Sequence, residues 1–241
     1  MFKTLRIAIG FLTVIPVNPR QFEAGDLGAA VKFFPVVGLI QGTFIWGLLY
    51  LLPRIFPIGV AVWLTVFASV LFNGLIHLDG FADTADSLGS RNREKSLAIM
   101  KDSRLGAFGA IALIFLISGK IFTLMELTDL SLLVLICITV LSRWVMAVML
   151  YTQPSVSQGL LQNFRFQFPR RDLGIATGLM LIVVCAAGID GLRLLGITLA
   201  VFLLLNWFIR KRWGGITGDI LGASNELVEL VCLLALNLRI G

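Results

Sequence analysis

The stretch SLLVLICITVLSRWVMAVML, residues 131–150, decides the fold class of this chain. Arg143 is the one charged residue within it. An α-helix needs about 20 consecutive, mainly apolar residues to cross the hydrocarbon core of a bilayer, because each residue adds about 1.5 Å of length. The stretch therefore predicts a membrane-spanning helix.

The rest of the chain repeats this pattern and predicts an all-α, polytopic membrane protein. Its residues are 58% hydrophobic and 14% charged, with a mean hydropathy of +0.93. A soluble domain carries roughly 25% charged residues, so that class is excluded. We expect about six to seven transmembrane helices in a single domain that covers residues 1–241. Besides residues 131–150, the apolar stretches are 36–52, 56–78, 106–127, 173–189, 194–209 and a weaker one at 226–240.

The N-terminal residues 2–17 resemble a signal peptide at first sight. Lys3 and Arg6 precede an apolar run, but Pro16 ends the run early and no small-residue cleavage site follows. We expect an amphipathic or re-entrant helix that lies at the membrane surface.

Positive charges collect on one side of the predicted topology. With the N-terminal region placed in the cytoplasm, most of the 20 lysines and arginines fall in cytoplasmic loops, whereas Arg54, Arg193 and Arg239 fall outside. This asymmetry follows the positive-inside rule. Contact of the basic loops with anionic lipid headgroups also accounts for the net charge of +6, so the charge indicates no nucleic acid partner. The sequence leaves open whether the chain forms a homo-oligomer.

An acidic segment, HLDGFADTAD at residues 77–86, directly follows one of the apolar runs. On a helix, Asp79, Asp83 and Asp86 fall within an arc of roughly 60°, because successive residues are 100° apart. Like charges so close repel one another, and a hard divalent cation with oxygen ligands neutralises them. We expect these aspartates to bind Mg²⁺ together with substrate phosphates. The alternative is a solvated acidic helix start with Asp79 as its N-cap, which explains only one of the three.

Polar residues near or within the apolar runs add three candidates. His77 is a supporting catalytic candidate, since it lies within one helical turn of the acids; the alternative is a hydrogen-bonded structural histidine. Arg143 is assigned to ligand binding, because a charged residue inside a membrane helix usually has a function. Asn73 is assigned to ligand binding as a polar residue that shortly precedes the acidic segment. Snorkelling to the lipid headgroups is the rival explanation for Arg143.

A second group of candidates lies at residues 100–109, MKDSRLGAFG. Lys101 and Arg104 supply cations, Ser103 and the free amides of a helix start supply donors, and Gly106 allows the backbone to approach a ligand closely. The segment predicts a cradle for phosphate. The alternative is a basic loop that only anchors the topology.

A third group lies in the glycine-rich segment WGGITGDILGASNE, residues 213–226. If the segment is helical, Asp219 and Glu226 are seven residues apart and share a face, as metal ligands or as a proton acceptor. The alternative is a flexible loop followed by a capped helix.

Carboxylates, Mg²⁺, basic phosphate contacts and membrane burial together favour transfer of a phosphorylated group at the membrane surface. At these residues the chain resembles the adenosylcobinamide-GDP ribazoletransferase family, also called cobalamin synthases. The resemblance runs from residue 11 to about 229, and its most specific part is the acidic segment joined to Lys-Asp-Ser-Arg. The matching pieces besides HLDGFADTAD are 11–16, 33–38, 99–104 with Gly106, Arg143 and 217–223.

The resemblance implies a specific reaction. A hydroxyl of α-ribazole, or of its 5′-phosphate, attacks the cobinamide-linked phosphate of adenosylcobinamide-GDP, and GMP leaves. It implies the three aspartates of 77–86 as Mg²⁺ ligands, and Lys101 and Arg104 as holders of the guanylyl phosphates. Asp102 and Asp219 would complete the metal shell, or one of them would accept the ribazole proton. The implied location is the cytoplasmic (inner) membrane of a prokaryote, with the active site facing the cytoplasm.

Two other classes remain open. A CDP-alcohol phosphotransferase-like enzyme also uses an Asp-rich motif with Mg²⁺, but no arginine follows Ala82, so the usual spacing of that motif is absent. A transporter would carry its acids near the middle of the bilayer on broken helices, whereas these acids are predicted near one interface. Accessibility of cysteines placed along 79–86 and 217–226 would distinguish a transporter from an enzyme.

Overall fold

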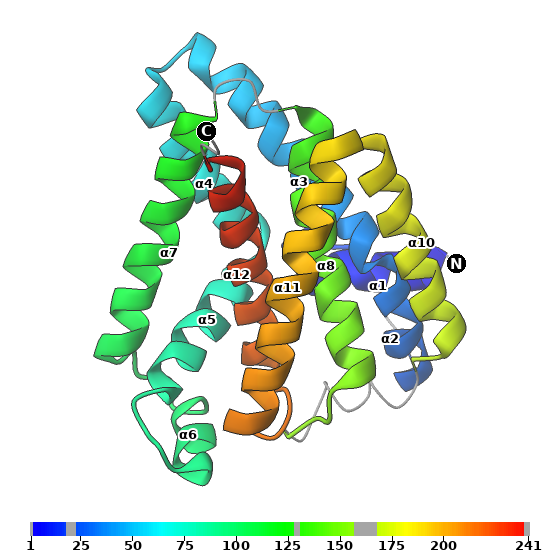
Figure 1. Cartoon of the computed structure of the whole chain (residues 1–241), viewed down its shortest axis with the longest axis vertical. Helices are drawn as coiled ribbons and strands as arrows, with labels where there is room; N and C mark the ends of the chain where they lie inside the picture. The colour runs from blue at the N-terminus through cyan, green and yellow to red at the C-terminus, as the bar shows by residue number, and fades with distance from the viewer. Residues whose placement is uncertain (1, 18–22, 128–130, 157–167, 239–241) are drawn as a thin grey trace.

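The computed structural model describes residues 2–17, 23–127, 131–156 and 168–238, and these residues are almost entirely helical (Figure 1). No strand forms within these four ranges. An isolated parallel bridge joins Ser155 to Ile216; its hydrogen bonds are Val156 N to Ile216 O, 3.0 Å, and Ile216 N to Pro154 O, 2.8 Å. The all-α fold class is confirmed.

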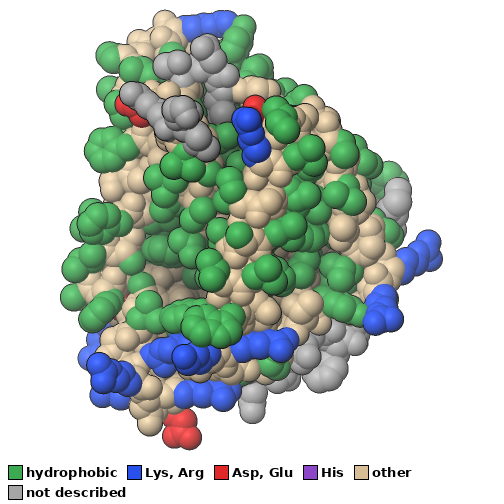
Figure 2. All heavy atoms as spheres, viewed as in Figure 1, with side chains coloured by type: hydrophobic (Ala, Val, Ile, Leu, Met, Phe, Trp, Pro, Cys, Tyr) green, Lys and Arg blue, Asp and Glu red, His purple; other side chains and the backbone are tan. Residues whose placement is uncertain are grey.

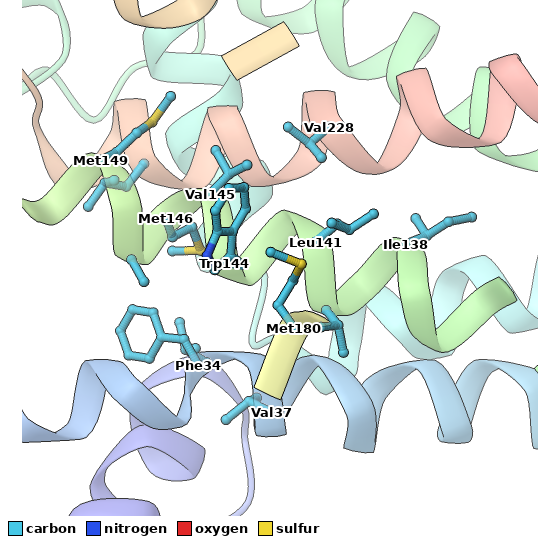
Figure 3. Close-up of a cluster of buried hydrophobic side chains, with 14 of the residues drawn as sticks. Phe34, Val37, Ile138, Leu141, Trp144, Val145, Met146, Met149, Met180 and Val228 are labelled. Carbon is cyan, nitrogen blue, oxygen red and sulfur yellow. The ribbon is translucent and has the colours of Figure 1, made fainter. Parts of the chain in front are cut away.

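Helix α8, Leu132–Thr152, forms the centre of the bundle. In its most apolar 18-residue window, 83% of the residues are buried. Figure 3 shows α8 lying between α3 and α12, with Phe34 of α3, Trp144 of α8 and Val228 of α12 among the buried side chains. The helices that pack on α8 are α3 (Phe34–Leu51), α10 (Arg170–Ala186), α11 (Gly188–Arg212) and α12 (Gly218–Leu236).

Small residues allow α3 and α8 to approach closely. A Cβ atom at Gly42 would lie 2.7 Å from the Cα of Ile136, so only glycine fits there. The hydroxyl of Thr139 donates to the carbonyl of Gly38 over 2.7 Å. Small residues and hydroxyl hydrogen bonds are the usual means by which helices associate inside a membrane.

Four stretches of the described residues form helices that are long and apolar enough to cross a membrane. They correspond to the predicted spans at 36–52, 106–127, 131–150 and 194–209. A bent pair of helices makes a fifth if it is one span, so the predicted count of about six to seven spans is not confirmed. The four stretches are Gly25–Arg54, Ala107–Glu126 (α7), Leu132–Thr152 and Gly188–Arg212.

The predicted span at 56–78 is not one straight helix. Helix α4, Ile58–Phe72, ends at Asn73, and α5, Ile76–Ser87, leaves it at an angle of 90°. Gly74 has φ +64° and Leu75 has φ +60°, so two consecutive residues in the left-handed region turn the chain. The bend directs the acidic segment across the bundle instead of along it. Asp79 also lies in the first turn of α5 and is not its N-cap, because the cap position is Leu75.

The predicted spans at 173–189 and 226–240 differ from the structure in length and position. The stretch 173–189 belongs to α10, which has 17 residues and begins with Arg170, Arg171 and Asp172. The weaker stretch at 226–240 belongs to α12, which begins eight residues earlier at Gly218. Residues 218–226 are therefore helical, as the shared face of Asp219 and Glu226 requires, and Thr217 caps this helix after a short non-helical stretch at 213–217.

The remaining elements cover the two ends of the bundle. The N-terminal helix α1, Phe2–Leu12, ends before Pro16 and buries Ile7, Ala8 and Leu12 while Phe2 and Lys3 face outward, as expected of an amphipathic helix. The salt bridge from Lys3 to Asp26, 2.6 Å, joins it to α2. The other short helices are α2 (Ala24–Ala30), η1 (Val31–Phe33), η2 (Leu52–Arg54) and α6 (Arg93–Ile99).

The surface separates apolar side chains from charges. Figure 2 shows hydrophobic side chains over the middle of the molecule and a band of lysine and arginine side chains along its lower end. That end is formed where α5 and α11 end and α7 and α12 begin (Figure 1). Phe115 of α7 is 72% exposed and Leu204 of α11 is 67% exposed, which suits contact with lipid.

Candidate active site

The acidic segment on α5 lies directly against the first turns of α12. A Cβ atom at Gly80 would stand 2.7 Å from the Cα of Asp219, and one at Gly222 would stand 3.1 Å from the Cα of His77. The two helices therefore cross in antiparallel order with backbone close to backbone. The sequence places glycine at both crossing points, so Asp219 is brought beside the acids of α5.

Three carboxylates form what we call the acidic cluster: Asp79, Asp83 and Asp219. Asp79 and Asp219 each repel the charge of Asp83, and Asp86 adds to this repulsion from one turn further along α5. The hydroxyl of Thr217 caps α12, accepting from Ile220 N over 3.2 Å, and lies 3.3 Å from Oδ2 of Asp219. Two of these acids come from one helix and the third from a segment more than a hundred residues away. The cluster is thus a product of the fold.

Asp86 has a different role from the one predicted for it. Its Oδ2 accepts from the amide of Gly106 and its Oδ1 from the amide of Gly109, both at 2.8 Å. A carboxylate that accepts two amides at a helix start satisfies two donors and complements the helix dipole. Asp86 therefore caps α7. The predicted phosphate cradle is corrected at this point, since two of the amides expected to be free for phosphate are already used by a side chain.

The basic loop before α7 is exposed, and two of its own residues form an ion pair with each other. Arg104 donates to Asp102 through Nε, 3.0 Å, and Nη2, 2.6 Å, and its side chain is 87% exposed. The guanidinium holds the pKa of the Asp102 carboxyl below its usual range. Lys101 and Ser103 are exposed beside it. Asp102 thus pairs with Arg104 here and is not part of the acidic cluster.

A second set of charges lies deeper in the bundle, and we call it the buried ionic network: Lys120, Arg143, Glu226 and Glu229. Lys120 of α7 donates to Glu226 over 2.5 Å and to Glu229 over 2.7 Å. Arg143 of α8 is fully buried and pairs with Glu229 and with the hydroxyl of Ser142, the latter over 2.9 Å. Two cations and two anions balance, which is what allows such groups to be buried.

The network corrects three sequence interpretations. Glu226, predicted as a metal ligand, is bound to Lys120 instead. Arg143 does not snorkel, since its side chain is 0% exposed and pairs with Glu229. Asn73, predicted to bind substrate, accepts from Arg143 over 3.5 Å at the end of α4. These residues hold α4, α7, α8 and α12 together.

His77 lies between the acidic cluster and the buried ionic network. Its Nδ1 is 3.2 Å from the side-chain amide of Asn225 and 3.7 Å from Glu226. It is 3% exposed, and its backbone lies against Gly222. The geometry supports the structural interpretation of His77 as a hydrogen-bonded link between α5 and α12.

Sequence reasoning missed Lys120, Asn225 and Glu229 as parts of this region. A signal for Lys120 existed, because a lysine in the middle of an apolar span requires a partner. Glu226 and Glu229 are three residues apart and thus share a helix face, but their partner lies more than a hundred residues earlier in the chain.

No group of three or more His, Cys, Asp or Glu side chains within the described residues is placed to hold a metal ion. Mg²⁺ rarely uses such a cage: it keeps several waters and binds one or two carboxylates together with substrate phosphates.

Comparison with known proteins gives one consistent result. The family model described as Cobalamin-5-phosphate synthase matches residues 4–237. Curated relatives named adenosylcobinamide-GDP ribazoletransferase include one from Desulforamulus reducens, 37% identical with 95% of this chain and 94% of the relative covered. Others are from Escherichia coli O17:K52:H18, 35% identical, and Klebsiella pneumoniae, 34% identical, each with 98% of this chain and 100% of the relative covered. No solved structure matches the chain.

Proposed function

Because the chain belongs to the cobalamin-5-phosphate synthase family, we propose that it joins adenosylcobinamide-GDP to α-ribazole, or to α-ribazole 5′-phosphate, with release of GMP. The product is adenosylcobalamin or its 5′-phosphate, and the reaction is the last assembly step of cobalamin. A membrane transferase of cobalamin biosynthesis fits both the family and the long apolar helices.

The observation that best supports this chemistry is that Asp79 and Asp83 of α5 lie close to Asp219 of α12. Carboxylates crowded at one end of a membrane bundle are costly unless a cation uses them. Both substrates reach this end from the aqueous phase, and a phosphate-bearing substrate brings the negative charge that requires a cation. The acidic cluster is the part of the chain best suited to this task.

Mg²⁺ would be held by Asp79 and Asp83, with substrate phosphates as further ligands, which leaves Asp219 free for another role. When bound, such a cation neutralises charge on the transferred phosphorus and on the leaving GMP. Asp86 is left out of this set, because both of its oxygens already accept amides of α7. Glu226 is left out because it is paired with Lys120.

The chain's own residues position the substrates and accept the proton. The hydroxyl oxygen of the ribazole forms a new bond to the cobinamide-linked phosphorus, and the bond from that phosphorus to the oxygen of GMP breaks. The hydroxyl proton passes to a carboxylate of the acidic cluster, for which Asp219 is suited because Thr217 orients it. Lys101, Ser103 and Arg104 contact the guanylyl phosphates. Arg104 can exchange Asp102 for phosphate at little cost, since ion pairs between fully exposed side chains contribute little to stability.

We place the enzyme in the cytoplasmic (inner) membrane of a prokaryote, with the acidic cluster facing the cytoplasm. The basic residues at the end of α11 and on α6 support this orientation, because these segments lie at the same end of the bundle as the start of α12, which carries Asp219 (Figure 1). Contact of these side chains with anionic lipid headgroups is part of the same proposal.

Turnover by the purified protein tests this function. We expect detergent-solubilised protein with adenosylcobinamide-GDP, α-ribazole and Mg²⁺ to form GMP and adenosylcobalamin in equal amounts, and EDTA to stop both. Asp83→Asn should lower turnover at least about 100-fold, because it removes charge from the cluster. Asp190→Asn is the matched control, since Asp190 is an exposed aspartate at the start of α11, paired with Arg193. Absence of product from folded protein, with turnover of a CDP-alcohol instead, would overturn the assignment.

A further inference from the structure

A cavity of about 130 Å³ opens beside Asp219, on the side of α12 that faces α1, α3 and α8. Its polar boundary is made by Asp219 and His77. Its walls are apolar and come from Phe11 of α1, Phe34 of α3 and Met146 of α8. We call this cavity the aromatic pocket. It shares Asp219 with the acidic cluster, so a molecule inside it touches the site where the phosphate is transferred.

The size of the aromatic pocket suits one flat ring system. An apolar cavity of about 150 Å³ lined by Leu, Ile and Phe side chains binds benzene, whereas a cavity needs only about 10–15 Å³ to hold a water molecule. The cavity beside the buried ionic network measures about 40 Å³, which admits water but no ring. A larger cavity of about 260 Å³ between α5, α7, α11 and α12 has no charged side chain among the described residues that line it.

The walls of the aromatic pocket favour a planar, apolar ligand. The rings of Phe11 and Phe34 are nearly parallel, with an interplanar angle of 15° and centroids 6.3 Å apart. Phe34 is 1% and Met146 is 3% exposed. A thioether against aromatic rings adapts its shape to a flat ligand at little cost. Faces of this kind stack on aromatic rings and offer no hydrogen bonds.

The lack of hydrogen-bonding groups in these walls distinguishes between the two substrates. Guanine carries several donors and acceptors, and each one buried without a partner costs roughly 1–3 kcal/mol. The corrin ring, which belongs to adenosylcobinamide-GDP like the guanine, is far larger than the cavity. The benzimidazole base of α-ribazole is flat and largely apolar. The cavity encloses about one of its two fused rings, so the rest of the base and the attached ribose would lie at the open rim, where Asp219 is found.

Resting on the function proposed above, we infer that the aromatic pocket binds the benzimidazole base of the attacking nucleoside. The pocket holds the base between α1, α3 and α8, and this places the ribose hydroxyl beside Asp219. The pocket then sets which lower base the enzyme accepts, through its volume and through the flatness of its walls.

Binding of the free base tests the inference without turnover. The probe is 5,6-dimethylbenzimidazole, titrated calorimetrically into the whole detergent-solubilised protein. We expect saturable binding, weakened at least tenfold by Met146→Trp, which fills the pocket. Leu205→Trp is the matched control, because Leu205 lines the larger cavity instead. Unchanged affinity in folded Met146→Trp protein would overturn the inference.

A second variant keeps the test decisive if the filled pocket destabilises the fold. Met146→Ala enlarges the pocket, so it should favour naphthimidazole, which has one more fused ring, over 5,6-dimethylbenzimidazole by at least tenfold relative to wild type. An unchanged preference would contradict the inference. If the protein bound the bases with these preferences but made no cobalamin, the base-binding role of the pocket would stand and the proposed reaction would be wrong. If the protein turned over and Met146→Trp raised only the KM for adenosylcobinamide-GDP, the proposed reaction would stand and the assignment of the pocket to the base would be wrong.

Discussion

Gly80 of α5 lies against the backbone of Asp219 in α12, so closely that a Cβ atom at Gly80 would stand 2.7 Å from the Cα and 2.8 Å from the carbonyl oxygen of Asp219. This approach joins the acidic segment to its third carboxylate. Because backbone meets backbone there, neither partner can yield by a change of rotamer. The relationship makes the crossing of the two helices a condition of the site.

Gly80→Ala should therefore separate α5 from α12 and lower both stability and turnover. The overpacked methyl group should cost about 1–3 kcal/mol in the free energy of unfolding. Gly178→Ala on α10 is the matched control, because a Cβ atom there meets nothing within 4 Å and alanine is favoured over glycine in a helix by up to about 1 kcal/mol. Thermal unfolding in detergent and product formation measure both effects. A Gly80→Ala protein as stable and as active as Gly178→Ala would show that the two helices do not cross this closely.

Asp86→Asn should affect stability more than dependence on Mg²⁺. The amide side chain keeps one acceptor for the start of α7 but loses the second acceptor and the charge, which should cost about 1–2 kcal/mol. The Mg²⁺ concentration for half-maximal turnover should stay near that of wild type. In Asp83→Asn, by contrast, it should rise at least about tenfold. If the Mg²⁺ concentration for half-maximal turnover rose equally in both variants, Asp86 would be a metal ligand, as its place on the helix face predicts.

Arg212 fixes the far end of α5, so Arg212→Gln should lower turnover from outside the acidic cluster. Its guanidinium donates to the carbonyl of Ser87 over 3.0 Å and to the hydroxyl of Ser96 over 2.9 Å, and it also bonds Ser90. Loss of these bonds frees the turn after α5, and we expect kcat to fall about tenfold with little change in membrane insertion. Lys211→Gln is the matched control, because Lys211 is exposed and lies over the ring of Trp207. Equal activity of the two variants would remove this role from Arg212.

The sequence predicts much of the membrane architecture and only part of the site. Long apolar runs identify α7, α8 and α11, because length and hydropathy alone decide whether a helix can span a bilayer. They miss the bend before α5, since Leu75 is apolar like its neighbours and nothing in its side chain indicates a positive φ. A hydropathy pattern therefore does not reveal a helix break that depends only on backbone conformation.

For a similar reason, only some of the site's contacts can be predicted from the sequence. Asp79 and Asp83 are predictable from helix periodicity, because both depend on local spacing. The partner of Asp86 depends on where α7 begins, and the partner of Glu226 depends on how α7 packs against α12. Periodicity places side chains on a face, but only tertiary packing decides which atoms that face meets.

The buried ionic network should be costly to break at one partner and far less costly to remove in matched pairs. Lys120→Met leaves Glu226 and Glu229 sharing one remaining cation, Arg143, inside the bundle. Removal of one partner from a buried ion pair typically destabilises a protein by about 3–5 kcal/mol, whereas apolar or neutral replacement of the whole pair is often neutral. The double variant Lys120→Met with Glu226→Gln should therefore recover a large part of the lost stability. Its coupling free energy in a double-mutant cycle should be at least about 1 kcal/mol.

Arg193→Met is the control for loss of a cation without burial, since Arg193 is 70% exposed and pairs with Asp190 across one helical turn. Such an exposed pair should contribute at most about 1 kcal/mol, so this variant should unfold close to the wild-type temperature. The order of stability should be wild type, Arg193→Met, the double variant and then Lys120→Met, measured by thermal unfolding in one detergent. If Lys120→Met unfolded at the same temperature as Arg193→Met, Lys120 would not be buried between the two glutamates, and the packing of α7 against α12 would have to differ from the one described.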